Sequence, residues 1–84
     1  MPRGWPPLTC REICDILQAL GFVHDRDESS HKIWIHHERH LIVPVDMHWD
    51  PASGPLISHL VKTQVRVSRE TFYGATKRTA KKLR

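Results

Sequence analysis

The apolar residues near the start of the chain have the spacing of a helix. Four of them fall on one helix face, at the intervals i, i+3, i+4 and i+7: Ile13, Ile16, Leu17 and Leu20. Thr9 is a suitable N-cap, and Glu12, three residues later, completes a capping box. Gly21 can take the left-handed conformation that often ends a helix. The pattern therefore predicts a helix over residues 9–20.

The middle of the chain contains short apolar runs that are typical of strands. Three runs favour a strand: residues 22–25, 31–36 and 41–45. The acidic residues 25–28 and the pair Ser29-Ser30 predict a turn after the first strand, and the polar residues 37–40 predict a hairpin connection after the second. Pro44 has no N–H to donate to a neighbouring strand, so we expect the third strand at an edge of the sheet.

The last part of the chain predicts two further helices. Residues 46–54 are expected to form a loop, and Pro55 is a good first residue for the second helix. That helix has a narrow apolar stripe: Leu56, Ile57, Leu60 and Val61. Ser68 is the expected N-cap of the third helix, whose weaker apolar stripe begins at Phe72. The order α-β-β-β-α-α predicts an α+β fold, with helices packed on one face of a three-stranded antiparallel sheet.

The composition is that of one small folded domain. The chain has 84 residues, of which 39% are hydrophobic and 26% charged, so we expect a single domain over residues 1–84. Residues 1–8 are expected to form an irregular, proline-rich arm without the apolar core of a signal peptide. No apolar run approaches the ~18 residues that cross a bilayer. We therefore expect a cytoplasmic protein, in which Cys10 and Cys14 are free thiols.

The net charge of +4 comes from one end of the chain. Residues 77–84, here called the basic tail, carry five basic residues and no acidic one: Lys77, Arg78, Lys81, Lys82 and Arg84. The remaining residues hold eight basic and nine acidic side chains, a balance of −1. Attraction to nucleic acid is therefore expected to be strongest at the basic tail, with a solvated helix end as the alternative.

The predicted strand 31–36 places different chemistry on its two faces. One face carries His31, Ile33 and Ile35, and the other carries Lys32, Trp34 and His36. A histidine at the start of a strand, beside hydroxyl groups and a lysine, is placed to meet a polar substrate, although a solvated histidine is the alternative. If Trp34 packs under the helices rather than stacking on a base, Ile33 and Ile35 lie exposed beside His31. Such exposure suggests a partner that covers the open face.

The order and spacing of several short motifs resemble the HicA family of toxin–antitoxin ribonucleases, whose fold resembles a double-stranded-RNA-binding domain. The motifs span about residues 8–73: Ser30-His31 with Trp34, then Val43-Pro44, Gly54, and Ser68-Arg69-Glu70-Thr71-Phe72. The chain departs from the family pattern at three places. Ser29 replaces the usual glycine, Asp46 stands where a second histidine is common, and the glycine between the last two helices is missing.

The resemblance implies an endoribonuclease toxin that a cognate HicB-like antitoxin neutralises. His31 would be the general acid or base that cleaves mRNA, with the 2′-hydroxyl as nucleophile and without metal or cofactor. Ser30 and Lys32 would contact the RNA, together with four side chains of the basic tail: Lys77, Arg78, Lys81 and Lys82. Two alternatives stay open: a non-catalytic RNA-binding module of the same fold, and an adaptor that binds protein through its open β-face. The sequence also leaves open whether the chain forms a homo-oligomer.

The histidines around the predicted hairpin raise a metal site as a further alternative. They are His36, His37 and His40, three of seven histidines in the chain. Neighbouring strand residues face opposite ways, so His36 and His37 could bind one ion only if the hairpin bends. No cysteine lies nearby, and the spacing is not that of a structural zinc site. We therefore expect solvated histidines and no metal.

Overall fold

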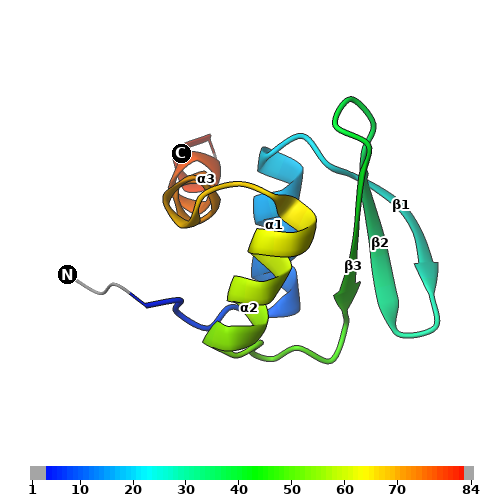
Figure 1. Cartoon of the computed structure of the whole chain (residues 1–84), viewed down its shortest axis with the longest axis horizontal. Helices are drawn as coiled ribbons and strands as arrows, with labels where there is room; N and C mark the ends of the chain where they lie inside the picture. Colours follow the sequence, from blue (N-terminus) through cyan, green and yellow to red (C-terminus); the bar gives the residue numbers. More distant parts are fainter. Residues whose placement is uncertain (1–3, 83–84) are drawn as a thin grey trace.

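The computed structural model describes residues 4–82, and the surroundings of side chains up to residue 75. Its elements follow the order α1 (Cys10–Ala19), β1 (Val23–Glu28), β2 (His31–His36), β3 (Leu41–Asp46), α2 (Gly54–Leu60), η1 (Val61–Val65) and α3 (Arg69–Lys82). The predicted α+β fold is confirmed, since Figure 1 shows the helices together on one side of an antiparallel sheet. No helix within residues 4–82 combines the length and hydropathy needed to cross a membrane.

The start of α1 forms as its sequence predicts. Thr9 has extended backbone angles, its hydroxyl accepts the Glu12 N–H at 3.2 Å, and Glu12 Oε1 accepts the Thr9 N–H at 2.9 Å. This reciprocal pair satisfies two N–H groups that would otherwise lack partners. Gly21 has φ +98° and ends the turn after the helix. The predicted helix is therefore confirmed to within one residue at each end.

The sheet has the order β1-β2-β3, so β2 is central and is paired on both sides. Trp34 lies opposite His24 on β1 and Val43 on β3, and these residues share the side of the sheet that the helices cover. Pro44 lies on the edge strand β3, as predicted, where its missing N–H costs no hydrogen bond within the sheet.

The prediction of an acidic turn over residues 25–28 is wrong. β1 continues to Glu28, and the turn is formed by Ser29 and Ser30. All six residues of β1 are exposed, so charged side chains keep their hydration on this edge strand. Arg26 also forms ion pairs with its neighbours Asp25 and Glu28. Acidic residues therefore do not prevent a strand here, although they reduce strand propensity in general.

The second helix begins one residue earlier than predicted and ends in a π-helical turn. Ser53 is its N-cap, and Gly54 is its first residue. A side chain at Gly54 would place its Cβ 2.5 Å from the Trp5 carbonyl oxygen, which explains the glycine. Arg66 then takes left-handed angles (φ 60°, ψ 49°) after η1, where a glycine is favoured. Ser68 accepts the Thr71 N–H at 3.0 Å, so the predicted cap of α3 is confirmed.

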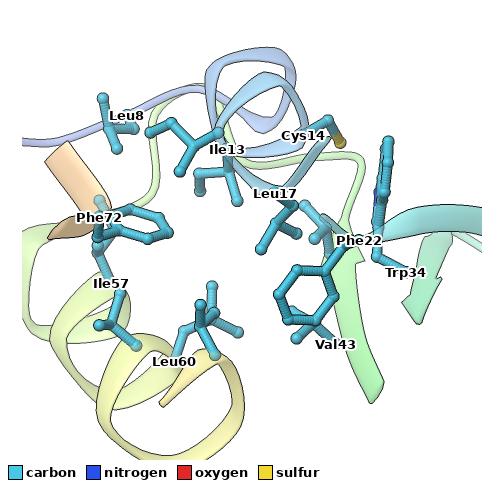
Figure 2. Close-up of a cluster of buried hydrophobic side chains, with 14 of the residues drawn as sticks. Leu8, Ile13, Cys14, Leu17, Phe22, Trp34, Val43, Ile57, Leu60 and Phe72 are labelled. Carbon is cyan, nitrogen blue, oxygen red and sulfur yellow. The ribbon is translucent and has the colours of Figure 1, made fainter. Parts of the chain in front are cut away.

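The core lies between the helices and the inner face of the sheet. Figure 2 shows ten of its residues: Leu8, Ile13, Cys14, Leu17, Phe22, Trp34, Val43, Ile57, Leu60 and Phe72. Trp34 is only 8% exposed, so its predicted place under the helices is confirmed. Leu56 is instead 45% exposed, because the buried side of α2 is narrower than the predicted stripe.

The prediction that Ile33 is exposed on the open face is wrong. Ile33 is 6% exposed, although it does not join the core on the helix side. It sits on the central strand, with Arg26 opposite it on β1 and Pro44 opposite it on β3. The exposed apolar residues of this face are instead Val23 and Ile42, the cross-strand neighbours of the half-buried Ile35.

Candidate functional site

His31 is the first residue of β2, directly after the turn that joins β1 to β2. Ser29 in that turn has φ 54°, a left-handed conformation that glycine adopts more easily than serine. The turn thus forms with serine at the position where a glycine was expected. Ser30 and His31 are both half-buried, so the two residues lie together at the accessible end of the central strand.

Two carboxylates flank His31 in the sheet, and each has a basic partner. Glu28 lies opposite His31 on β1, and Asp46 lies opposite it on β3. Arg26 Nε donates to Glu28 Oε2 at 2.7 Å. The charge of Glu28 is therefore partly balanced, which lowers its repulsion toward an anionic substrate.

Asp46 lies opposite His31 in the sheet and contacts a second histidine, His48. Its Oδ1 accepts the His48 backbone N–H at 2.8 Å and lies 3.2 Å from His48 Nδ1. The hydrogen bond from the His48 backbone holds the pKa of Asp46 below its ordinary value, and the nearby charge of His31 acts in the same direction. Asp46 thus remains an anion between two imidazoles.

A backbone hydrogen bond joins the loop that carries His48 to the residue before β2. The Met47 N–H donates to the Ser30 carbonyl at 2.8 Å, next to His31. The His48 side chain is 81% exposed, so it can meet a substrate. Sequence analysis placed this segment in a loop and missed His48. The available signal was an aspartate two residues before a histidine, a spacing at which a carboxylate can bond the local backbone.

Lys32 does not lie beside His31, because successive strand residues point to opposite faces. Its side chain is on the side of the sheet that faces the helices, where Nζ is 3.8 Å from Asp27 Oδ1. Asp27 Oδ1 also lies 2.7 Å from His24 Nε2. Lys32 therefore belongs to a different surface from His31, although it is its neighbour in sequence.

The histidines near the hairpin do not form a cluster. His36 packs edge-on against Phe22, with ring centroids 5.2 Å apart, and its Nδ1 accepts the Arg39 N–H at 3.2 Å. His37 and His40 are exposed in the turn between β2 and β3. Within the described residues, no group of three or more histidine, cysteine or acidic side chains is arranged to hold a metal ion.

The remaining predicted RNA-binding residues cannot be placed at this site. Their backbone continues α3, and their side chains lie outside the described residues: Lys77, Arg78, Lys81 and Lys82. The described site thus consists of a half-buried imidazole, an anion and an exposed imidazole at one end of the sheet. Such a group can accept a proton at one position and donate one at another.

Comparison with protein families identifies a match over most of the chain. The family model described as "HicA toxin of bacterial toxin-antitoxin" matches residues 10–63, well over half of the chain. The matched part contains His31 and Asp46, together with the loop that carries His48. No curated protein matches the chain.

Proposed function

The chain belongs to the HicA toxins of bacterial toxin–antitoxin systems, and we propose that it is a cytoplasmic endoribonuclease that cleaves mRNA through His31. The observation that carries this proposal is the position of His31. It lies at the accessible start of β2, in the family motif, with the Asp46 carboxylate opposite it on β3. A carboxylate beside an imidazole favours one orientation of the ring, and general acid–base catalysis depends on such positioning.

In the proposed reaction, the RNA supplies its own nucleophile. His31 takes the proton of a 2′-hydroxyl, whose oxygen attacks the adjacent phosphorus. The bond from phosphorus to the 5′-oxygen then breaks, leaving a 2′,3′-cyclic phosphate. The departing 5′-oxygen takes up a proton, which we assign to His48, because Asp46, which lies opposite His31, also contacts this second imidazole. These steps need neither a metal ion nor a covalent bond to the protein.

Family membership also implies an antitoxin partner. We propose that this partner covers the open face of the sheet. Val23 is 47% exposed and Ile42 is 60% exposed, and they flank Ile35 on that face. Apolar side chains exposed together on a small sheet favour an interface, since covering them removes apolar surface from water. His31 projects from the same face, so a cover there also blocks access to it.

Replacement of His31 by alanine tests the proposed catalysis. We expect His31→Ala to lower the rate of RNA cleavage by about 10²–10⁴-fold, the usual contribution of a general acid or base. The fold should persist, because a half-buried side chain at a strand end carries little packing energy. The matched control is His37→Ala, which removes an exposed histidine from the turn that follows β2 and should leave the rate unchanged.

Two further conditions separate this chemistry from its alternatives. Cleavage should persist in EDTA and should fail on DNA of the same sequence, which lacks the 2′-hydroxyl. If His31→Ala cleaves RNA at the wild-type rate, His31 is not catalytic. If the wild-type protein binds RNA without cleaving it, the chain is a non-catalytic RNA-binding module.

A further inference from the structure

A cavity of about 700 Å³ lies on the side of the sheet opposite to His31. It is largely open to solvent and is bordered by the first half of α1, the inner side of β1 and β2, and the loop after β3. Lys32 and Trp34 line it from β2, whereas His31 points to the other face. Its volume falls within the ~300–1,000 Å³ typical of sites for small organic groups. The proposed catalytic steps make no use of this cavity.

The walls of the cavity are aromatic and sulfur-containing. They include Trp34, Trp49, Met47, Cys10 and Cys14. Figure 2 shows the Trp34 indole beside the Cys14 thiol. The indole N–H of Trp34 is buried and lacks a full hydrogen bond within the described residues, although it interacts weakly with the Cys14 thiol. Trp34 is a buried core residue, so the half-buried Trp49 indole supplies the accessible aromatic surface. Together with the polarisable sulfur atoms, that surface favours a flat, unsaturated ring beside it.

The polar groups of the cavity offer both donors and acceptors. Arg11 and Lys32 supply donors, and Asp15 and Asp50 supply acceptors. Among the described residues, the ion pair given for Lys32 is a long one, 3.8 Å from Asp27, so its ammonium group can bind a further anion. An alkyl chain would make no use of these polar groups, and a bare phosphate would make no use of the aromatic and sulfur-containing wall. A nucleobase matches the set, because it has two π faces and an edge of donors and acceptors.

We propose that this cavity binds an unpaired nucleobase of the RNA substrate, with Lys32 on the adjoining phosphate. The inference rests on the proposed RNA cleavage, and it names the substrate class as single-stranded RNA. Bases in an A-form duplex are stacked and paired, so they cannot enter a cavity of this kind without being extruded.

The cavity and the His31 site share one end of the sheet. Lys32 directly follows His31 on β2, and Met47, which lines the cavity, donates its N–H to the Ser30 carbonyl at 2.8 Å. An RNA strand that bends around the start of β2 therefore passes both surfaces. One phosphate then meets His31, while the base of a nearby nucleotide enters the cavity.

The test compares RNA with and without bases on proteins with and without the cavity. The probes are a 2′-O-methyl oligoadenylate, which the proposed chemistry cannot cleave, and the same ribose–phosphate chain lacking all bases. Cys10→Phe fills the cavity from α1, and Trp49→Ala removes one of its walls. The matched control is Leu56→Phe, a bulky substitution at an exposed position of α2. Thermal unfolding verifies that each variant is folded.

In the wild-type protein and in Leu56→Phe, the oligoadenylate should bind more tightly than the chain without bases. Cys10→Phe and Trp49→Ala should each reduce this base-dependent gain by about tenfold, within the range measured for stacking of one base on aromatic side chains. Annealing the oligoadenylate to its complement should remove the difference in affinity between the wild-type protein and Cys10→Phe, because paired bases cannot enter the cavity.

Two results would overturn the inference. One is a base-dependent gain in affinity that is equal in the wild-type protein, Cys10→Phe and Trp49→Ala. Absence of this gain in all three proteins counts as the same result. The other is loss of antitoxin binding in Cys10→Phe with RNA binding unchanged, which would make the occupant a protein segment. Since these probes are bound and not cleaved, the result does not depend on catalysis. If cleavage depends on His31 but the cavity variants keep the base-dependent gain in affinity, only the inference about the cavity is refuted. If the cavity variants lose that gain but the wild-type protein does not cleave RNA, only the proposed ribonuclease activity is refuted.

Discussion

At the residue scale, the fold changes the acid–base chemistry of Cys14. Burial disfavours the thiolate and raises the pKa of Cys14 from 9.0 to about 12. Cys10, whose sulfur lies 4.0 Å away, acts in the same direction. Both cysteines are free, as the sequence led us to expect. The Cys14 thiol therefore stays neutral near physiological pH and is a poor nucleophile.

This pKa predicts how stability changes in alkaline solution. The folded state keeps the Cys14 proton up to about pH 12, whereas the unfolded chain loses it near pH 9. The folded state is therefore favoured fully below pH 9, and the advantage declines between pH 9 and 12. Relative to Cys14→Ala, the free energy of unfolding of the wild-type protein should fall across this range by up to ~1.4 kcal/mol per pH unit. Urea unfolding at several pH values measures this free energy. If it changes with pH in the same way in the wild-type protein and in Cys14→Ala, the prediction is contradicted.

At the scale of elements, three connections use left-handed residues that are not glycine, and one of these residues is His40 in the turn between β2 and β3. The other two depart from the family pattern. Ser29 has φ 54° in the turn between β1 and β2, and Arg66 has φ 60° after η1. At both connections the family pattern has a glycine, and this chain has another residue. The backbone conformation is therefore kept while the residue changes, at a cost of about 1 kcal/mol for a side chain in this region.

Restoring glycine at either position should stabilise the protein. Ser29→Gly and Arg66→Gly should each raise the free energy of unfolding by about 0.5–1 kcal/mol, since relief of the left-handed strain exceeds the added flexibility of the unfolded chain. Gln18→Gly, at an exposed position inside α1, is the matched control and should lower it by about 1 kcal/mol. Urea denaturation gives all three values. Destabilisation by Ser29→Gly would show that its side chain makes a contact worth more than the strain.

At the scale of the whole molecule, charge is distributed unevenly along the chain. Residues 1–76 carry a balance of −1, whereas the basic tail carries five positive charges. Much of the acidic charge lies on β1, where Asp25 and Glu28 pair with Arg26. Long-range attraction of RNA is therefore expected from the tail, while the described site supplies chemistry and short-range contacts.

Removal of the basic tail should weaken RNA binding more than it slows cleavage. Each phosphate contact on a single strand contributes ~0.7 to the slope of log K against log salt, so deleting residues 77–84 should reduce that slope by roughly 1–2 units. The rate at saturating RNA should change much less, because His31 belongs to β2, far from the tail along the chain. A variant with glutamine at Lys77, Arg78, Lys81 and Lys82 keeps the length of the chain and should show a similar loss. An unchanged slope in both proteins would make the tail a solvated helix end.

The local pattern of the sequence was sufficient to predict the main helices and strands and their order. The capping box at Thr9 and the spacing of the apolar residues defined α1, because a helix is stabilised by contacts between residues three and four apart. Alternation along residues 31–36 correctly put Trp34 and Ile33 on opposite faces of the sheet, because strand side chains alternate strictly between faces. The Ser30-His31 motif, together with the order of the motifs that follow it, was likewise enough to indicate the family.

Only the tertiary structure decided which residues meet across the sheet. The sequence treated Asp46 and His48 as loop residues, whereas pairing of β2 with β3 brings Asp46 opposite His31, with His48 attached to it. Alternation put Lys32 on the face opposite to His31, and only the structure shows that Lys32 there lines a cavity beside α1. The sequence predicted Ile33 to be exposed, whereas Ile33 is buried on the central strand between β1 and β3. The physical reason is the same in each case: strand register and helix placement bring distant residues together, and neither is encoded in local periodicity.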